Sequence, residues 1–234
     1  LDNYLEQSEL RALSDWTKNF KDNSFKLGIL SGRSIKAARY RYSELHIPKP
    51  SVWICSAGTE IYYADDEKSD IFWQDSITVD WNRKAVEDSL FDLKDYLELQ
   101  SPDQQSPFKV SYLLKEPGES ILPLVRKKLR QSGFSASPHL KCHWYLDVLP
   151  LRASRAEAIR FLSLRWGLSL EDILVVVSQQ GDAELIKGLT SVVVPVEHDS
   201  SLEKFRSQQR VFFSNGFNNG VLDGLKYFRF LKTH

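Results

Sequence analysis

The most informative segment of the sequence is Phe25-Lys26-Leu27-Gly28-Ile29-Leu30-Ser31-Gly32-Arg33-Ser34. Its apolar half predicts a short buried strand, and its second half brings a hydroxyl, a glycine and an arginine to the first turn of a helix. Backbone N–H groups at a helix N-terminus attract an anion, glycine lets the backbone approach it, and arginine adds charge. The stretch therefore predicts a phosphate-binding turn at Ser31, Gly32 and Arg33.

Composition indicates a globular chain and excludes several classes of partner. The 234 residues are 42% hydrophobic, which is enough for a core and an inserted subdomain. Lysine and arginine number 31 and are balanced by 31 acidic residues, so no net field favours nucleic acid, an anionic membrane or a polyacidic partner. Cys55 and Cys142 lack metal-ligand spacing and are too few for a disulfide framework, which indicates a reducing cytoplasm.

Targeting signals are missing from the sequence as given. No apolar run approaches the ~18 residues that a membrane span needs, and no signal peptide opens the chain. The chain contains no methionine, and it begins abruptly at Leu1-Asp2-Asn3. We therefore expect a fragment or an excised domain of a soluble, cytoplasmic protein.

Apolar spacing in the first third of the chain predicts helices that alternate with strands. Such alternation is typical of a parallel sheet covered by helices on both faces, where ligands bind beyond the carboxyl ends of the strands. The predicted elements are a helix at Glu9–Phe20, a strand at Phe25–Leu30, a helix at Ser34–Leu45, and strands at Val52–Cys55 and Glu60–Tyr63 joined by a turn.

The pattern changes near Thr78 and changes back after Val148, which indicates an insertion of mixed α+β type. We expect core residues at 1–77, an inserted cap at 78–148, and the rest of the core at 149–234. The elements predicted for the cap are a helix at Asn82–Leu99, a strand at Phe108–Leu114, a helix at Ile121–Ser132 and strands from Phe134 to Leu149. The elements predicted after it are a helix at Arg155–Trp166, a strand at Ile173–Val177, a short helix after Ser178–Asp182, a strand at Ser191–Val196 and a helix at Gly220–Leu231.

Several short motifs, spread in order along almost the whole chain, carry a family resemblance. They are Leu1-Asp2-Asn3, Ser31-Gly32-Arg33-Ser34, Gly58-Thr59-Glu60-Ile61-Tyr62, Lys109-Val110-Ser111-Tyr112, Asp147-Val148-Leu149-Pro150 and Gly216–Phe230. The sequence resembles the haloacid-dehalogenase-like phosphatases, and among them sucrose-phosphate phosphatase and the related carboxyl-terminal domain of sucrose-phosphate synthase. The stretch Leu149–Arg155, with Arg165-Trp166-Gly167, is more similar to the synthase-borne domain. The resemblance implies an α/β core of the haloacid-dehalogenase-like, Rossmann-related type with an inserted α+β cap.

The resemblance also implies a catalytic apparatus that is incomplete in this chain. Such phosphatases use an aspartate nucleophile and a second aspartate, two residues later, as general acid and base. Asp2 matches the second aspartate, so the nucleophile position falls before Leu1, and Tyr4 stands where a threonine is expected. Arg155 takes the place of a lysine, which keeps the positive charge on a wider and more rigid group.

The late loop that carries metal-binding carboxylates in the active relatives reads Ser178-Gln179-Gln180-Gly181-Asp182-Ala183 here. In this alignment Gln179 and Ala183 replace the two carboxylates, whereas a shifted alignment brings Asp182 and Glu184 into the site. A glutamine carbonyl does not neutralise the charge of Mg²⁺, so metal affinity is expected to be low. We expect no metal site and no cofactor, with Asp2 and Asp182 as weak candidate ligands, and Mg²⁺ only if the domain is an active phosphatase.

The resemblance assigns Ser31, Gly32 and Arg33 to phosphate and Glu60, Tyr62 and Lys109 to the sugar. Each has a simpler alternative. The turn at Ser31 is equally that of a helix cap, in which the hydroxyl accepts a backbone N–H. Glu60, Tyr62 and Lys109 are polar residues of types that are usually exposed. Arg155 can equally be a residue that simply begins a helix.

The predicted function is a degenerate, non-catalytic domain of sucrose biosynthesis that binds a phosphorylated sugar such as sucrose-6-phosphate, or a partner. The expected partners are the glycosyltransferase domain of a sucrose-phosphate synthase or a sucrose-phosphate phosphatase, with no nucleic acid and no membrane. One alternative is an active Mg²⁺-dependent sucrose-6-phosphate phosphatase whose nucleophile lies outside the sequence given. Another is a structural interaction domain without a ligand.

Overall fold

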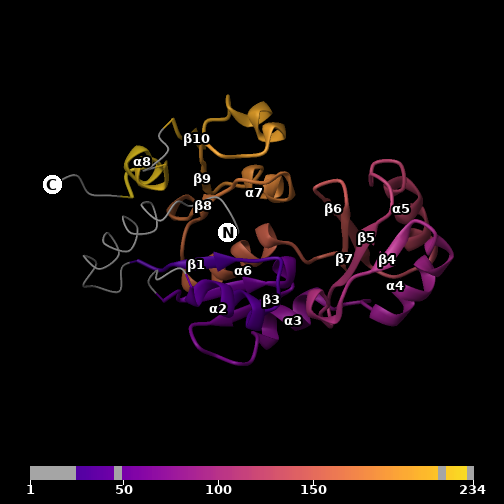
Figure 1. The fold of residues 1–234 in the computed structure, drawn as a ribbon. Coiled ribbons are helices and arrows are strands. Elements are labelled where there is room, and N and C mark those ends of the chain that lie inside the picture. The colour runs from indigo at the N-terminus through magenta and orange to yellow at the C-terminus, as the bar shows by residue number, and fades with distance from the viewer. Residues whose placement is uncertain (1–24, 45–48, 216–219, 231–234) are drawn as a thin grey trace. The chain divides into compact units, whose positions relative to one another are not determined.

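The structure is a computed structural model, and it describes residues 25–44, 49–215 and 220–230 (Figure 1). The chain divides into two compact units. One consists of Gly28–Ala38 and Ser51–Ala158, and the other includes Arg39–Pro50 and Ile159–His234. The predicted helix at Glu9–Phe20 lies outside the described residues, as do Asp2 and Tyr4. The division into core and cap at residues 78 and 148 stays a prediction.

A three-stranded sheet in the first unit holds the turn that the sequence singled out. Its order is β1-β2-β3, with β1 (Gly28–Leu30) parallel to β2 (Val52–Cys55) and β3 (Glu60–Tyr63) antiparallel to β2. The strands β2 and β3 have the predicted bounds, whereas β1 begins three residues later than predicted. Gly28 is paired with Val52, and Pro50 lies just before that point and has no N–H for the ladder.

Helix α2 (Ile35–Ser43) follows β1, and helix α3 (Ile71–Ile77) follows β3. The sequence predicted α2 but not α3. The signal for α3 was Asp70, whose carboxylate accepts a hydrogen bond from the Trp73 N–H at 3.0 Å and so caps the first turn. Trp73 and Ile77 bury the inner side of this short helix.

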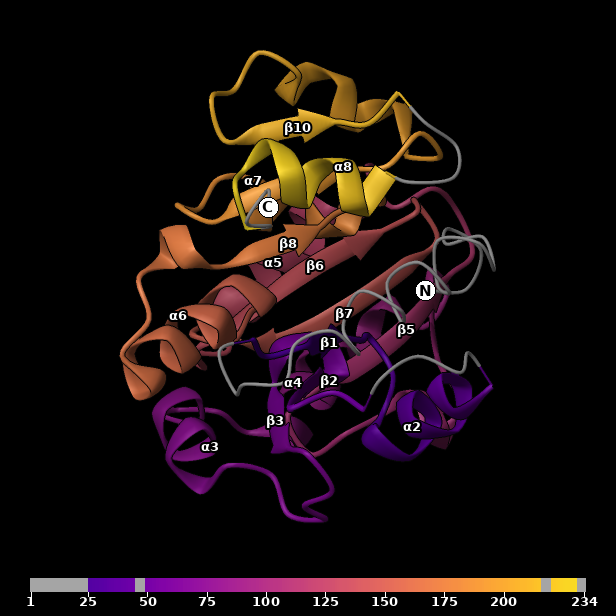
Figure 2. The ribbon, with the colours of Figure 1, turned by 90° about the vertical axis from the view of Figure 1, so that its left-hand side faces the viewer.

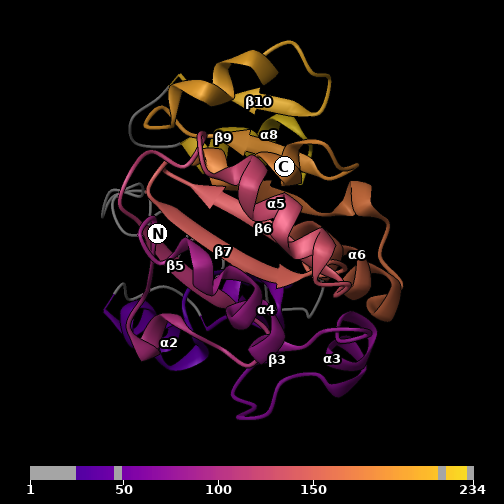
Figure 3. The same cartoon turned by 90° about the vertical axis from the view of Figure 1, so that its right-hand side faces the viewer.

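A four-stranded antiparallel sheet with two helices forms the rest of the first unit. The strand order is β4-β5-β7-β6, and Figure 3 shows α4 and α5 lying across one face of this sheet. Apolar side chains from both helices and from strands β4 to β7 make its core. The bounds are α4 (Arg83–Leu90), β4 (Leu97–Leu99), β5 (Val110–Leu114), α5 (Leu122–Gln131), β6 (Ala136–Lys141) and β7 (Tyr145–Pro150).

The helix predicted at Asn82–Leu99 is wrong in its second half. The α-helix ends at Leu90, a 3-10 turn follows at Phe91–Leu93, and the chain then forms strand β4. Leu90, Leu93 and Leu97 recur at helical spacing, and all three are buried in the same core. The spacing therefore identified the buried residues correctly. Pairing of Leu97 with Leu114 places the last of them on a strand.

The second unit contains a parallel sheet of order β10-β9-β8, and Figure 2 shows helix α8 lying across it. Gly224 of α8 lies against Val193, and a Cβ added to this glycine would be 2.2 Å from the Val193 Cγ2. Strand β10 was not predicted. Strands β8 and β9 and helix α8 are shorter than predicted by two to four residues, and α7 lies where a short helix without stated bounds was predicted. Their bounds are β8 (Leu174–Val176), α7 (Ala183–Ile186), β9 (Ser191–Val194), β10 (Val211–Phe213) and α8 (Gly220–Tyr227).

Helix α6 (Arg155–Trp166) has the predicted bounds. It begins beside Ser154, whose hydroxyl accepts a hydrogen bond from the Glu157 N–H at 3.1 Å. Within residues 25–44, 49–215 and 220–230, no helix is both long and apolar enough to cross a membrane.

Candidate anion-binding site

The turn after β1 is held by backbone hydrogen bonds to the end of β2. The Ser31 N–H donates to the Ile54 carbonyl at 2.8 Å, and the Ser31 carbonyl accepts from the Ala57 N–H at 3.2 Å. The Ser31 hydroxyl accepts from the Arg33 N–H at 3.1 Å, so the side chain does act as a local cap. Arg33 is exposed. The cap leaves the hydroxyl hydrogen of Ser31 able to donate to a ligand.

The turn between β2 and β3 brings the start of α6 close to this segment. Ser56, Ala57 and Gly58 all have positive φ, at 50°, 62° and 99°. A Cβ on Gly58 would be 2.4 Å from the Ser154 carbonyl carbon and 2.5 Å from the Arg155 nitrogen. Only glycine fits this backbone approach. Arg155 is the first residue of helix α6, as the alternative of a helix start predicts. It also lies next to the predicted phosphate turn.

Lys109, which directly precedes β5, contacts the same turn. Its ammonium donates to the Gly32 carbonyl at 2.9 Å. Only 2% of the residue is exposed, so the alternative of a solvated strand lysine is wrong. A buried ammonium needs hydrogen bonds and a counter-charge to offset its lost hydration.

Two more cationic groups lie at Gly32. A Cβ placed on this glycine would be 3.4 Å from the Lys141 Nζ and 3.5 Å from the Arg155 Nη2. Together with the hydrogen bond from Lys109, the heads of three basic side chains meet at one backbone position. Lys141 comes from the end of β6 and was not among the residues that the sequence nominated.

Asp147 on β7 is the counter-ion of this group. Its carboxylate forms an ion pair with Lys141 and accepts a hydrogen bond from the Ser111 hydroxyl at 2.6 Å. Burial on its own would raise the pKa of Asp147, but the charges of Lys141 and Lys109 and the bond from Ser111 hold that pKa below its usual value. The carboxylate is therefore ionised at neutral pH.

Glu60 and Tyr62 of β3 are buried, with exposed fractions of 7% and 8%. The alternative that they are surface residues is wrong. The Glu60 carboxylate accepts hydrogen bonds from the Ser56 hydroxyl at 2.9 Å and from the Tyr62 hydroxyl at 3.2 Å. Burial, and then the nearby Glu60 charge, raise the pKa of Tyr62. The tyrosine therefore stays a neutral hydrogen-bonding group.

Two pKa shifts report the surroundings of these groups. Burial is the main cause that lowers the pKa of Lys109, to about 8; the charges of Asp147 and Glu60 oppose this shift, and those of Lys141 and Arg155 add to it. Burial likewise lowers the pKa of His139 to about 4, with Asp147 opposing and Lys141 and Arg155 adding to the shift. His139 is therefore neutral at pH 7. An anion at Gly32 would favour the charged form of Lys109.

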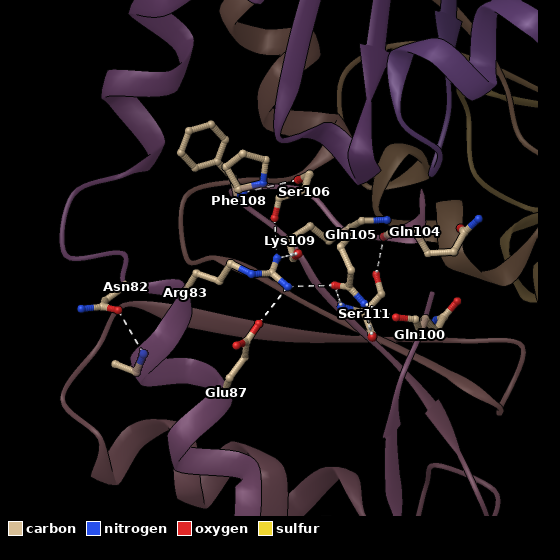
Figure 4. A network of polar contacts seen from close by, with 12 residues as sticks. Asn82, Arg83, Glu87, Gln100, Gln104, Gln105, Ser106, Phe108, Lys109 and Ser111 are labelled. Carbon is tan, nitrogen blue, oxygen red and sulfur yellow. Dashed lines mark hydrogen bonds and ion pairs between the residues drawn. The ribbon is translucent and has the colours of Figure 1, made fainter. Parts of the chain in front are cut away.

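The loop that carries Lys109 is fixed by Arg83 of α4 (Figure 4). The guanidinium donates to the backbone carbonyls of Ser106 and Lys109 and to the Gln105 side-chain oxygen, the last at 3.2 Å. It also forms an ion pair with Glu87 at 2.8 Å. A planar group with several donors suits such a set of carbonyls better than an ammonium does.

Some residues of this site could have been found from the strand pattern. Ser111 and Asp147 are polar positions between apolar neighbours on β5 and β7, and they lie opposite each other in the sheet. His139 lies opposite Asp147 on β6. Strand alternation therefore marks one polar row across three strands. Lys141 and Arg83 gave no signal of this kind, because only the tertiary structure brings them to the turn and its loop.

Asp182, the other weak metal candidate, lies just before α7 in the second unit, where its N–H donates to the Gln179 carbonyl at 3.0 Å. Within the described part of the chain, no group of three or more His, Cys, Asp or Glu residues could hold a metal ion. The basic side chains around Gly32 do not fit Mg²⁺, which requires anionic oxygen ligands. They do fit an anion.

The fold is of the haloacid-dehalogenase-like type. A solved structure of the sucrose-phosphatase from Synechocystis sp. PCC6803, in complex with sucrose and phosphate, superposes with a TM-score of 0.85 at 22% identity. That similarity covers 96% of this chain and 92% of the other. A haloacid dehalogenase-like hydrolase from Bacillus subtilis gives a TM-score of 0.68 at 16% identity, over 97% and 86% of the two chains.

The particular family follows from the sequence match. Residues 1–229 match the family described as sucrose-6F-phosphate phosphohydrolase, and the chain belongs to this family. Sucrose-phosphatase 2 of Nicotiana tabacum is 31% identical over 156 residues, which cover 66% of this chain and 36% of the relative. A probable sucrose-phosphate synthase 3 of Arabidopsis thaliana is 28% identical over 185 residues, which cover 69% and 17%. The chain thus spans about a third or less of these two relatives.

Proposed function

We propose that this sucrose-phosphatase-like domain binds a phosphorylated sugar of the sucrose-6-phosphate type and does not hydrolyse it. The observation that carries the proposal is the meeting of Lys109, Lys141 and Arg155 at Gly32. These three basic groups lie at one turn, and the carboxylates of Asp147 and Glu60 also act on Lys109. A phosphate monoester carries close to two negative charges at neutral pH and would be attracted to such a group of cationic donors.

Hydroxyl recognition would come from the buried polar groups beside the cations. Glu60 is a strong acceptor, and Tyr62 both accepts and donates. Lys109 has further N–H groups besides the one that donates to Gly32. A sugar hydroxyl that replaces one of these contacts would be read by fixed groups, because the strands hold Glu60 and Tyr62 in place.

The case against hydrolysis comes from the residues at the catalytic positions of the family. Gln179 and Ala183 stand where the resemblance expects metal-binding carboxylates, and the groups around Gly32 are cationic. Loss of an essential catalytic group in enzymes with a covalent intermediate costs about a millionfold in rate. In this proposal the turn keeps its affinity for phosphate and the domain lacks an effective means of cleaving the ester.

The second candidate is an active Mg²⁺-dependent sucrose-6-phosphate phosphatase. It is favoured by family membership and by Arg155, which preserves a positive charge at the lysine position. A third candidate is an interaction domain without a ligand, attached to or bound by a sucrose-phosphate synthase. The match to a synthase relative over 17% of that relative's length supports association with such an enzyme. We also propose that the boundaries between the core and the inserted cap lie at residues 78 and 148.

Two assays on the intact natural protein separate the three candidates. Calorimetry with sucrose-6-phosphate, inorganic phosphate and sucrose measures binding, and phosphate release from sucrose-6-phosphate with Mg²⁺ measures hydrolysis. We expect binding of both phosphates, weak binding of sucrose, and no turnover. Turnover near the ordinary enzyme rate of about 10 per second supports the phosphatase. No heat with any ligand at millimolar concentration supports the interaction domain.

A further inference from the structure

Lys141 differs from the other two basic residues at Gly32 in its surroundings. Its side chain is 24% exposed, whereas Lys109 is 2% exposed. It lies at the end of β6, opposite Tyr145 and directly before the β6–β7 turn, in which Cys142 and His143 have positive φ. A lysine at a strand end with a partly exposed, flexible stem can move its ammonium by several ångströms without a change in the backbone.

The Lys141 ammonium lies between two sites for negative charge. On one side it forms the ion pair with Asp147, and on the other it lies 3.4 Å from the position that a Cβ on Gly32 would take. The lysine head therefore lies within van der Waals contact distance of the Gly32 turn. The Asp147 carboxylate does not depend on Lys141 alone, because it also accepts from Ser111 and lies near Lys109.

We propose that Lys141 is a phosphoryl-binding residue, and that Asp147 is the counter-ion that it leaves when the anion binds at Gly32. The ligand is a phosphate monoester or inorganic phosphate. This inference rests on the proposed function, since it assigns a further contact within the same site. In this scheme Asp147 competes with the ligand for Lys141, so the ion pair lowers phosphate affinity. When phosphate binds, Lys141 exchanges Asp147 for the anion.

The exchange hypothesis and a purely structural ion pair differ in how the effect of one substitution depends on Lys141. Asp147→Asn removes the competitor and retains an oxygen that accepts the Ser111 hydrogen bond. Exchange predicts tighter phosphate binding, by about fivefold or more, and that the gain disappears in the Lys141→Gln background. A structural pair predicts no gain, or a gain that persists in that background because it comes from the lost charge alone. The double-mutant comparison isolates this coupling from the general change in charge, because both backgrounds lose the same carboxylate.

The test is calorimetric titration of the intact protein with inorganic phosphate and with sucrose-6-phosphate. Lys141→Gln is expected to weaken both by tenfold or more, and Lys141→Arg, which keeps the charge, by less than threefold. Lys128→Gln is the matched control, because Lys128 also pairs with an aspartate, Asp92, at 2.6 Å in the same unit. It is expected to bind within twofold of the wild type. Thermal unfolding checks that each variant is folded.

Wild-type-like phosphate affinity in Lys141→Gln overturns the inference while leaving the proposed function standing. If Lys141→Gln does not fold, Lys141→Ala takes its place in the double-mutant comparison: a gain from Asp147→Asn that disappears in that background supports exchange, and a gain that persists there overturns it. If the wild type binds neither phosphate nor sucrose-6-phosphate at millimolar concentration, the proposed function fails and the inference fails with it.

Discussion

The ammonium of Lys109 donates a hydrogen bond to the carbonyl oxygen of Gly32 at 2.9 Å, across 77 positions of sequence. This contact joins the residue before β5 to the turn after β1. Both groups lie in the same compact unit. The lysine is buried beside two other cationic groups, and its charge is offset in part by Asp147 and Glu60.

Substitution Lys109→Met should separate binding from stability. Loss of a charged donor to the ligand is expected to weaken binding of sucrose-6-phosphate by about tenfold or more, in line with a hydrogen bond to a charged group. Stability at pH 7 should not fall, because an unfavourably buried charge is removed together with the hydrogen bond. Calorimetry and urea unfolding measure the two effects. A variant that binds normally would remove Lys109 from the site.

Stability should depend on pH through Lys109. Burial lowers its pKa to about 8 from a model-peptide value of 10.5, so the unfolded chain binds more protons between these values. Stability therefore rises with pH across that window. Relative to Lys109→Met, the wild type should gain on the order of 2 kcal/mol between about pH 7.5 and pH 10. Urea unfolding of both proteins at the two pH values measures the difference. A constant difference would contradict the shifted pKa.

Phosphate affinity should fall as pH rises above 8. The charged groups that face Lys109 are Asp147, Lys141, Glu60 and Arg155, and the pKa of Lys109 itself is lowered to about 8. The ester is already fully ionised there, since its second pKa is about 6. Calorimetric titrations from about pH 7 to pH 9.5 should show the decline in the wild type. A flat profile in the Lys109→Met variant is the expected control.

Gly58→Ala should disrupt the close contact between the β2–β3 turn and the start of helix α6. The added Cβ would lie 2.4 Å from the Ser154 carbonyl carbon, and φ is +99°. Strain and displacement of the α6 start should cost about 3 kcal/mol or more. Gly133→Ala is the matched control, because its φ is +76° and a Cβ there meets none of the described residues within 4 Å. It should cost only about 1 kcal/mol. Equal losses in thermal unfolding would contradict the steric argument.

Arg83→Lys should loosen the loop that carries Lys109 while keeping the charge beside Glu87. An ammonium cannot donate to the Ser106 and Lys109 carbonyls and the Gln105 oxygen with the same planar geometry. Hydrogen exchange in residues 102–109 should become faster, and phosphate affinity should fall severalfold. Lys84→Gln on the same helix, where the lysine is 83% exposed, should leave both unchanged.

The sequence was informative where local pattern and tertiary environment agree. The bounds of β2, β3 and α6 were predicted correctly, because an apolar run or a capping serine marks each one. Leu97 was assigned to a helix because helical spacing and a strand pairing bury the same side chain. Strand β10 was not predicted, since its three residues follow a polar loop without periodicity.

The site was predictable in part for the same reason. The turn at Gly32 has a local signature, so it could be located from sequence. The burial of Lys109 and Glu60 has none, because it depends on how the turns and strands pack around them. Lys141 reaches Gly32 from 109 positions further along the chain, and only the fold brings the two together.

The central claim is that the domain holds a sugar phosphate and does not cleave it. Phosphorus NMR of the intact protein mixed with an equal amount of sucrose-6-phosphate, with Mg²⁺ present, tests both parts in one sample. We expect a shifted or broadened ester signal that persists for hours. Conversion of that signal to inorganic phosphate within minutes would contradict it.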